Sequence, residues 1–73
     1  MKTIIVIIEP SNDEIEIFCG SPSEFGLILD VVASDLSDLC RQNLKAHIEK
    51  NWNKHEIPIF QNSEEYFLQL RFD

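Results

Sequence analysis

Few side chains of this sequence are of a type that does chemistry, and their spacing keeps them apart. Cys40 and His47 are seven residues apart on a predicted helix, which separates them by about 10.5 Å along its axis. Nucleophilic catalysis requires the base within reach of the nucleophile. His47 and His55 are eight residues apart, while zinc ligands must each lie about 2 Å from one ion. The spacing predicts no catalytic residue and no metal site.

The cysteines and glycines point away from cofactor chemistry as well. Cys19 and Cys40 match no zinc or redox motif, and we expect both to be buried thiols. The chain has two glycines, Gly20 and Gly26, too few for a glycine-rich loop that cradles phosphate. We therefore expect no cofactor, and a protein that is not an enzyme.

Length and charge narrow the classes of partner. The 73 residues form one domain, 1–73, with 6 Lys and Arg against 13 Asp and Glu, a net charge of −7. This charge argues against direct binding of nucleic acid or an anionic membrane, and it permits a basic protein partner.

The apolar run Ile4–Ile8 ends at Glu9-Pro10. It is shorter than the roughly 7–15 apolar residues of a signal peptide and the roughly 20 of a membrane helix. A cytoplasmic location is the expectation.

The first strand of the predicted sheet spans Lys2–Glu9 and is apolar on both faces. Because side chains alternate along a strand, Ile5 and Ile7 lie on one face, opposite Ile4 and Val6. Two apolar faces are typical of a central strand that is covered on both sides. With a single helix predicted to cover one face, we expect a second copy of the chain to cover the other, which makes the protein a homodimer.

Three further strands follow from alternation and turn residues. Glu14–Cys19 forms a hairpin with the first strand, and Leu27–Val32 follows the turn-forming run Gly20–Ser23. Tyr66–Phe72 alternates strictly and forms the last strand.

A single amphipathic helix is predicted between the third and last strands. Ser34 is a candidate N-cap, and the helix ends within Asn51–His55, before Pro58. Apolar residues recur at three- and four-residue spacing, which places one stripe toward the sheet: Leu36, Leu39, Cys40, Leu44, Ile48 and Trp52.

The predicted fold is α+β, in two layers, with the element order β-β-β-α-β. Tight turns make the first three strands antiparallel, and a crossover helix sets the last strand parallel to the first. The result is a four-stranded mixed sheet of order 3-2-1-4, with one helix packed on one face. The residues expected in the core or at the dimer interface are Ile4, Val6, Ile8, Leu44, Ile48 and Trp52.

This order, together with two stretches of sequence, resembles the HicB-like antitoxin domains in their short, single-domain form. The stretches are Asn43-Leu44-Lys45-Ala46-His47-Ile48 in the helix and the tail from Ile57-Pro58 through Tyr66–Asp73. The resemblance implies the β-β-β-α-β fold and the binding of a small basic toxin that cleaves RNA. Many members carry a C-terminal DNA-binding segment, and because the sequence ends at Asp73, we expect no direct DNA binding.

Acidic residues around the first hairpin are the candidate partner-binding residues: Glu9, Asp13, Glu14 and Glu16. Carboxylates grouped in this way steer a basic partner toward the surface. Three hypotheses remain open. The chain is a HicB-like module that neutralises a basic toxin, an orphan structural or interaction domain with an unknown partner, or an acidic inhibitor that mimics nucleic acid.

Overall fold

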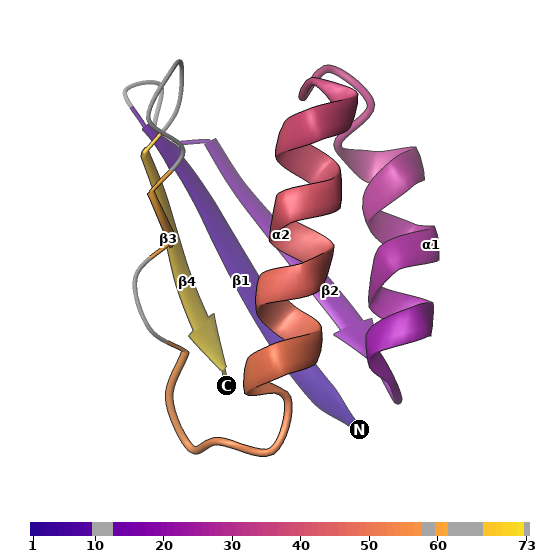
Figure 1. Cartoon of the computed structure of the whole chain (residues 1–73), viewed down its shortest axis with the longest axis vertical. Helices are drawn as coiled ribbons and strands as arrows, with labels where there is room; N and C mark the ends of the chain where they lie inside the picture. Colours follow the sequence, from indigo (N-terminus) through magenta and orange to yellow (C-terminus); the bar gives the residue numbers. More distant parts are fainter. Residues whose placement is uncertain (10–12, 58–59, 62–66, 73) are drawn as a thin grey trace.

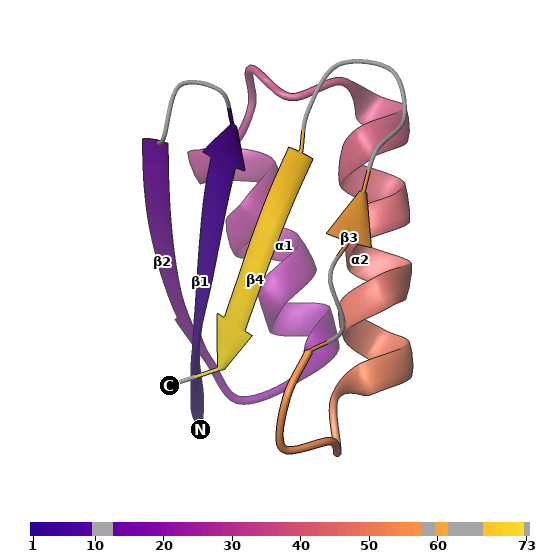
Figure 2. The same cartoon turned by 90° about the vertical axis from the view of Figure 1, so that its left-hand side faces the viewer.

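The protein consists of an antiparallel sheet with two helices on one of its faces (Figures 1 and 2). The structure is a computed structural model that describes residues 1–9, 13–57, 60–61 and 67–72. The elements, in chain order, are β1 (Lys2–Glu9), β2 (Asp13–Cys19), α1 (Pro22–Val32), α2 (Asp38–Asn51), β3 (Phe60–Gln61) and β4 (Phe67–Phe72).

Strand β1 lies between β2 and β4, and the strand order is β2-β1-β4-β3. All three strand pairs are antiparallel. Ile4 is paired with Ile17 on one side and with Phe72 on the other. The predicted first hairpin is confirmed, with β1 at its predicted bounds and β2 beginning one residue earlier.

The predicted third strand, Leu27–Val32, is wrong, because this segment belongs to helix α1. Ser21 is the N-cap, its Oγ accepts a hydrogen bond of 3.2 Å from the backbone N–H of Glu24, and Pro22 occupies the first turn. Glu24 Oε1 in turn accepts from the backbone N–H of Gly20 at 3.3 Å. A serine followed three residues later by a glutamate is the sequence pattern of a capping box. Here the glutamate accepts from the residue before the N-cap, and proline favours the first helical position.

The fold class predicted from the sequence is therefore wrong. The described residues form two helices where one was expected, and their sheet is antiparallel rather than mixed, with an order other than 3-2-1-4. A single crossover helix would set the last strand parallel to the first. Here the helix pair leads into the β3–β4 hairpin, which brings β4 back antiparallel to β1. The β-β-β-α-β fold implied by the HicB resemblance is wrong for the same reason.

Helix α2 is confirmed as an amphipathic helix, with a different N-cap. Ser37, not Ser34, caps it, because Ser37 Oγ accepts from the backbone N–H of Cys40 at 3.2 Å. Leu39 is 62% exposed, so it does not belong to the buried stripe as predicted. The helix ends at Asn51, with Trp52 as C-cap, inside the predicted range.

The core lies between the helices and the face of β1 and β2 that they cover. Its buried members are Ile4, Val6, Ile17, Cys19, Phe25, Leu29, Ala33, Leu36, Cys40, Leu44, Ile48 and Ile57, with Trp52 packed against them. The side chain of Ile8 lies outside the described residues. Ile5, on the opposite face of β1, is only 1% exposed although no helix covers it. Ile5 is therefore buried within a single chain, while Phe18 on the same face of the sheet is 62% exposed.

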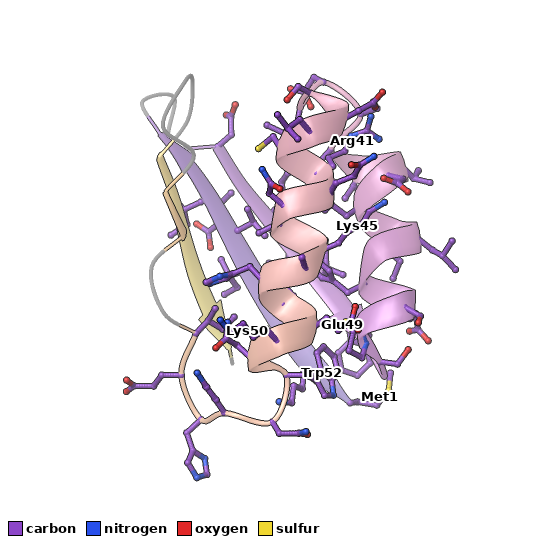
Figure 3. All side chains as sticks on the ribbon, in the orientation of Figure 1. Met1, Arg41, Lys45, Glu49, Lys50 and Trp52 are labelled. Atoms are coloured by element: carbon purple, nitrogen blue, oxygen red, sulfur yellow. The ribbon has the colours of Figure 1, made fainter. Side chains whose placement is uncertain are left out.

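The start of β1 is joined to the carboxyl end of α2. Lys2 Nζ donates a hydrogen bond to the carbonyl oxygen of Trp52 and lies 4.8 Å from the centroid of its ring. A lysine over an indole face adds an electrostatic attraction. This contact fixes the carboxyl end of α2 beside the start of β1 (Figure 3).

Two substitutions test whether the segment Leu27–Val32 is helical, as in α1, or a strand. Leu29 is completely buried, whereas Leu27 is 71% exposed, although residues two apart would share one face of a strand. We expect Leu29→Ala to lower the free energy of unfolding by about 2–5 kcal/mol, and Leu27→Ala to change it by less than about 0.5 kcal/mol. Urea denaturation followed by circular dichroism measures both. Equal losses would contradict the helical assignment.

Candidate functional site: the β2 edge and the helix layer

Strand β2 forms one edge of the sheet and carries acidic residues on the face away from the helices. Ile17 and Cys19 are buried in the core, while Glu14, Glu16 and Phe18 are exposed, Phe18 to 62%. The alternation predicted for this strand is therefore present. It presents two carboxylates and one aromatic ring along one side of the strand.

The two glutamates of β2 are available for a partner. Within the described part of the chain, neither Glu14 nor Glu16 has a hydrogen bond or ion pair, whereas Asp13 is already engaged in an interaction. Glu14 is paired in register with Ile7, and Glu16 with Ile5. The side chain of Glu9, the remaining candidate, lies outside the described residues. The structure thus brings Glu14 and Glu16 together on one face of the edge strand.

A second cluster of charges joins the two helices, and the sequence did not predict it. Asp30 of α1 accepts from Lys45 Nζ at 2.7 Å and from Arg41 Nη1 at 3.2 Å. Arg41 also contacts the carboxylate of Asp38 and donates through Nε to the carbonyl of Leu36 at 3.2 Å. Arg41 and Lys45 follow one another along the side of α2 that faces α1 (Figure 3). The cluster holds α1, α2 and the turn between them together.

Gly26 of α1 packs against the aliphatic stem of Lys45 at this cluster. A β-carbon built on Gly26 would lie 3.4 Å from Lys45 Cδ, which is an ordinary van der Waals contact. Two shallow hollows of about 220 and 380 Å³ flank this stem. Asp30 and Lys45 line both of them. Because both cations are already paired with Asp30, these hollows do not offer a free positive site for an anion.

The electrostatics of the cluster favour ionised Asp30. The hydrogen bond from Lys45, followed by the charges of Lys45 and Arg41, lowers the pKa of Asp30 below its ordinary value. The sequence placed Asp30 on a predicted strand, and a strand in that position gave no reason to pair it with cations of α2. The available signal was the four-residue spacing of Arg41 and Lys45, which places two cations on one helix face.

The two cysteines lie in the core and not at the surface. Cys19 and Cys40 are both buried and free, and burial, with the nearby charge of Glu24, raises the pKa of the Cys19 thiol. A thiol with a raised pKa is a poor nucleophile at neutral pH. Among the described residues, no three His, Cys, Asp or Glu side chains are grouped to hold a metal ion. Asn51, buried at the end of α2, donates to the carbonyl of His47 at 2.8 Å.

Helix α1 also carries an exposed aliphatic stripe. Leu27 and Val31, one turn apart, are 71% and 77% exposed, and the neighbouring Val32 is 48% exposed. Scattered exposed aliphatic residues are normal, but a contiguous group marks a candidate contact surface. This surface lies on the helix layer, whereas the contact surface expected from the sequence was the open face of the sheet.

Comparison with known proteins yields no match for this chain: no family model, no curated protein and no solved structure corresponds to it. No helix in the described part of the chain is both long enough and apolar enough to cross a bilayer. The function therefore has to be argued from the surfaces described above.

The ion-pair cluster predicts a pH-dependent contribution to stability. Because the pKa of Asp30 is lowered by folding, its contribution is present above the unfolded-state pKa and is lost as the pH falls through the folded-state value. We expect Asp30→Asn to lower the urea midpoint at pH 7, by less than the loss of a buried side chain such as Leu29→Ala. The loss relative to the parent chain should shrink in high salt and disappear at low pH. Asp35→Asn, at an exposed aspartate of the α1–α2 turn, is the control. A loss that is independent of pH, or equal in the control, would contradict the role of Asp30.

Proposed function

We propose that this chain is a small protein-binding module that recognises a basic protein through the exposed carboxylates of β2. The observation that carries the proposal is the contrast between two surfaces. Glu14 and Glu16 have no partner among the described residues, whereas Arg41 and Lys45 are held by Asp30 on the helix layer. The negative charge of β2 is therefore not offset by these two cations.

Electrostatic attraction explains what such a surface does for binding. The net charge of −7 attracts a basic partner over long range, and carboxylates placed at the contact raise the association rate. The same charge repels a nucleic-acid backbone, so direct binding of DNA or RNA is not part of the proposal. The proposed role needs no catalytic residue and no cofactor, and we place it in the cytoplasm.

The resemblance to HicB-like domains supplies one partner to test first, a small basic toxin that cleaves RNA. The resemblance rests on the residues of α2 and the tail, and α1 stands where it implies a strand. An acidic protein that occupies the nucleic-acid site of an enzyme would use the same carboxylates, so the captured protein separates these two readings. Binding of neither kind of protein would leave the chain an orphan interaction domain.

The test of this proposal compares two charge-matched double variants. Glu14→Gln with Glu16→Gln removes the β2 carboxylates, and Glu49→Gln with Glu56→Gln removes two exposed carboxylates elsewhere. We expect the immobilised chain to capture a basic protein from its native host at low salt, and the β2 variant to lose at least tenfold in affinity for it. Equal binding by both variants, or failure to capture a basic protein, would contradict the proposal.

The aliphatic stripe of α1 favours a second contact, with another copy of the chain. We propose that two α1 helices pair antiparallel, which sets Leu27 of each copy against Val31 of the other about a two-fold axis. Burying these exposed side chains supplies the hydrophobic driving force. The homodimer expected from the sequence is thereby assigned to α1 instead of to the open face of the sheet.

Light scattering coupled to gel filtration tests the dimer. We expect about twice 8.5 kDa for the chain at micromolar concentration, and the monomer mass for Leu27→Ser with Val31→Ser. Phe18→Ser, which removes the exposed ring of the open sheet face, should leave the dimer intact. A monomeric parent chain would refute the proposal, and a dimer broken only by Phe18→Ser would place the interface on the sheet.

A further inference from the structure

We propose that the basic partner binds β2 by strand addition, with an extended segment whose Lys or Arg residues occupy alternate positions. This inference rests on the proposed function and adds the shape and sequence pattern of the bound segment. It predicts that the partner extends the sheet beyond β2, not merely that it is attracted by charge.

The first step is the open edge of the sheet. Strand β2 has seven residues and ends the strand order β2-β1-β4-β3, and no described segment runs along its outer side (Figure 2). In an antiparallel pair, alternate residues direct both their N–H and C=O groups toward the same side. About three of the seven residues of β2 therefore present backbone groups to the outside. An edge of this length is a template for another strand.

The second step is the side-chain pattern along this edge. Glu14, Glu16 and Phe18 alternate on the face away from the helices, at a spacing of about 6.6 Å. A strand added to β2 places its own alternate side chains opposite these three, within contact distance. Opposite charges in directly paired positions stabilise a sheet. In an antiparallel segment, the first residue lies opposite Phe18 and should be aromatic or aliphatic. The third and fifth residues lie opposite Glu16 and Glu14 and should be Lys or Arg.

The other face of the added strand is also specified. On the helix side of the sheet, Ile15 of β2 and Ile28 of α1 are only partly buried, and both pack against the core. A strand beside β2 extends this side of the sheet next to α1. Apolar residues at the intervening positions would complete the cover of these two isoleucines, which makes the segment amphipathic with a period of two.

The same pattern disfavours a second copy of β2 as the occupant in the two registers that pair most of the strand. In the antiparallel register that pairs all seven residues of β2, Glu16 of one copy lies directly opposite Glu16 of the other. A shift that centres the pair on Ile15 sets Glu14 against Glu16 twice. Like charges in directly opposed positions destabilise a sheet. The edge is therefore built to disfavour its own strand and to favour a basic one.

The experiment uses short synthetic peptides with the intact chain. The probe is acetyl-Phe-Val-Lys-Val-Lys-amide, and the control of identical composition is acetyl-Phe-Val-Val-Lys-Lys-amide, whose adjacent lysines point to opposite faces of a strand. A third peptide carries the probe sequence with alternate backbone amides N-methylated, which removes hydrogen-bond donors without changing charge. Titration is followed by NMR chemical shifts, and amide hydrogen exchange of β2 is measured in the complex.

N-methylation at alternate residues can be placed in two ways, and both versions of the third peptide are tested. Strand addition predicts that the probe binds at least tenfold more tightly than the composition control, and at least tenfold more tightly than one of the two N-methylated versions. The outward-directed amides of β2 should become protected from exchange, and Glu14→Gln with Glu16→Gln should weaken the probe at least tenfold. Equal binding of all peptides, without protection of β2, would overturn the inference. Capture of a basic protein without protection of β2 would overturn strand addition and leave the proposed function standing. Selective binding of the probe without a captured basic protein would support strand addition at β2 and contradict the proposed function.

Discussion

The burial of one sheet face by two helices is the constraint on which the rest of this small structure depends. Phe25 and Leu29 of α1 are completely buried together with Ile17 and Cys19 of β2. A chain of 73 residues buries a limited share of its surface, so it needs both helices to complete one core. Because α1 packs on the face of the sheet at β2 and not along the outer edge of this strand, the edge remains open. The architecture that completes the core thus also creates the candidate binding edge.

The distribution of charge follows from this arrangement. On the helix layer, Asp30 draws Arg41 and Lys45 into a cluster that joins α1 to α2, and the lysine stem packs against Gly26. Exposed ion pairs are individually weak, so their contribution here is to the relative placement of the helices more than to total stability. The carboxylates of β2 lie on the opposite face of the sheet, away from these cations. The fold therefore separates Arg41 and Lys45 from the carboxylates of β2, and this separation favours β2 as the partner-binding site.

The errors in the predicted topology share one physical origin. The segment Leu27–Val32 is a run of β-branched and aliphatic residues interrupted by Asp30, and short apolar runs of this kind fit a strand or a buried helix equally well. The capping box of Ser21 and Glu24, with Pro22 at the first helical position, was the local signal that distinguishes the two. Treating Gly20–Ser23 only as a turn left this signal unused. Once α1 is assigned as a strand, a single crossover and a parallel last strand follow as further errors.

The sequence by itself determined the parts of this protein that depend on local pattern. Strict alternation defined β2 and the side on which Glu14 and Glu16 lie, and the three- and four-residue spacing of Cys40, Leu44 and Ile48 defined α2. Tertiary structure alone decided the antiparallel placement of β4 beside β1 and the burial of Ile5 within one chain. It also decided the pairing of Asp30 with cations 11 and 15 residues away. Each of these depends on how α1 and α2 pack on the sheet, and no local periodicity records a contact between segments that are distant in the chain.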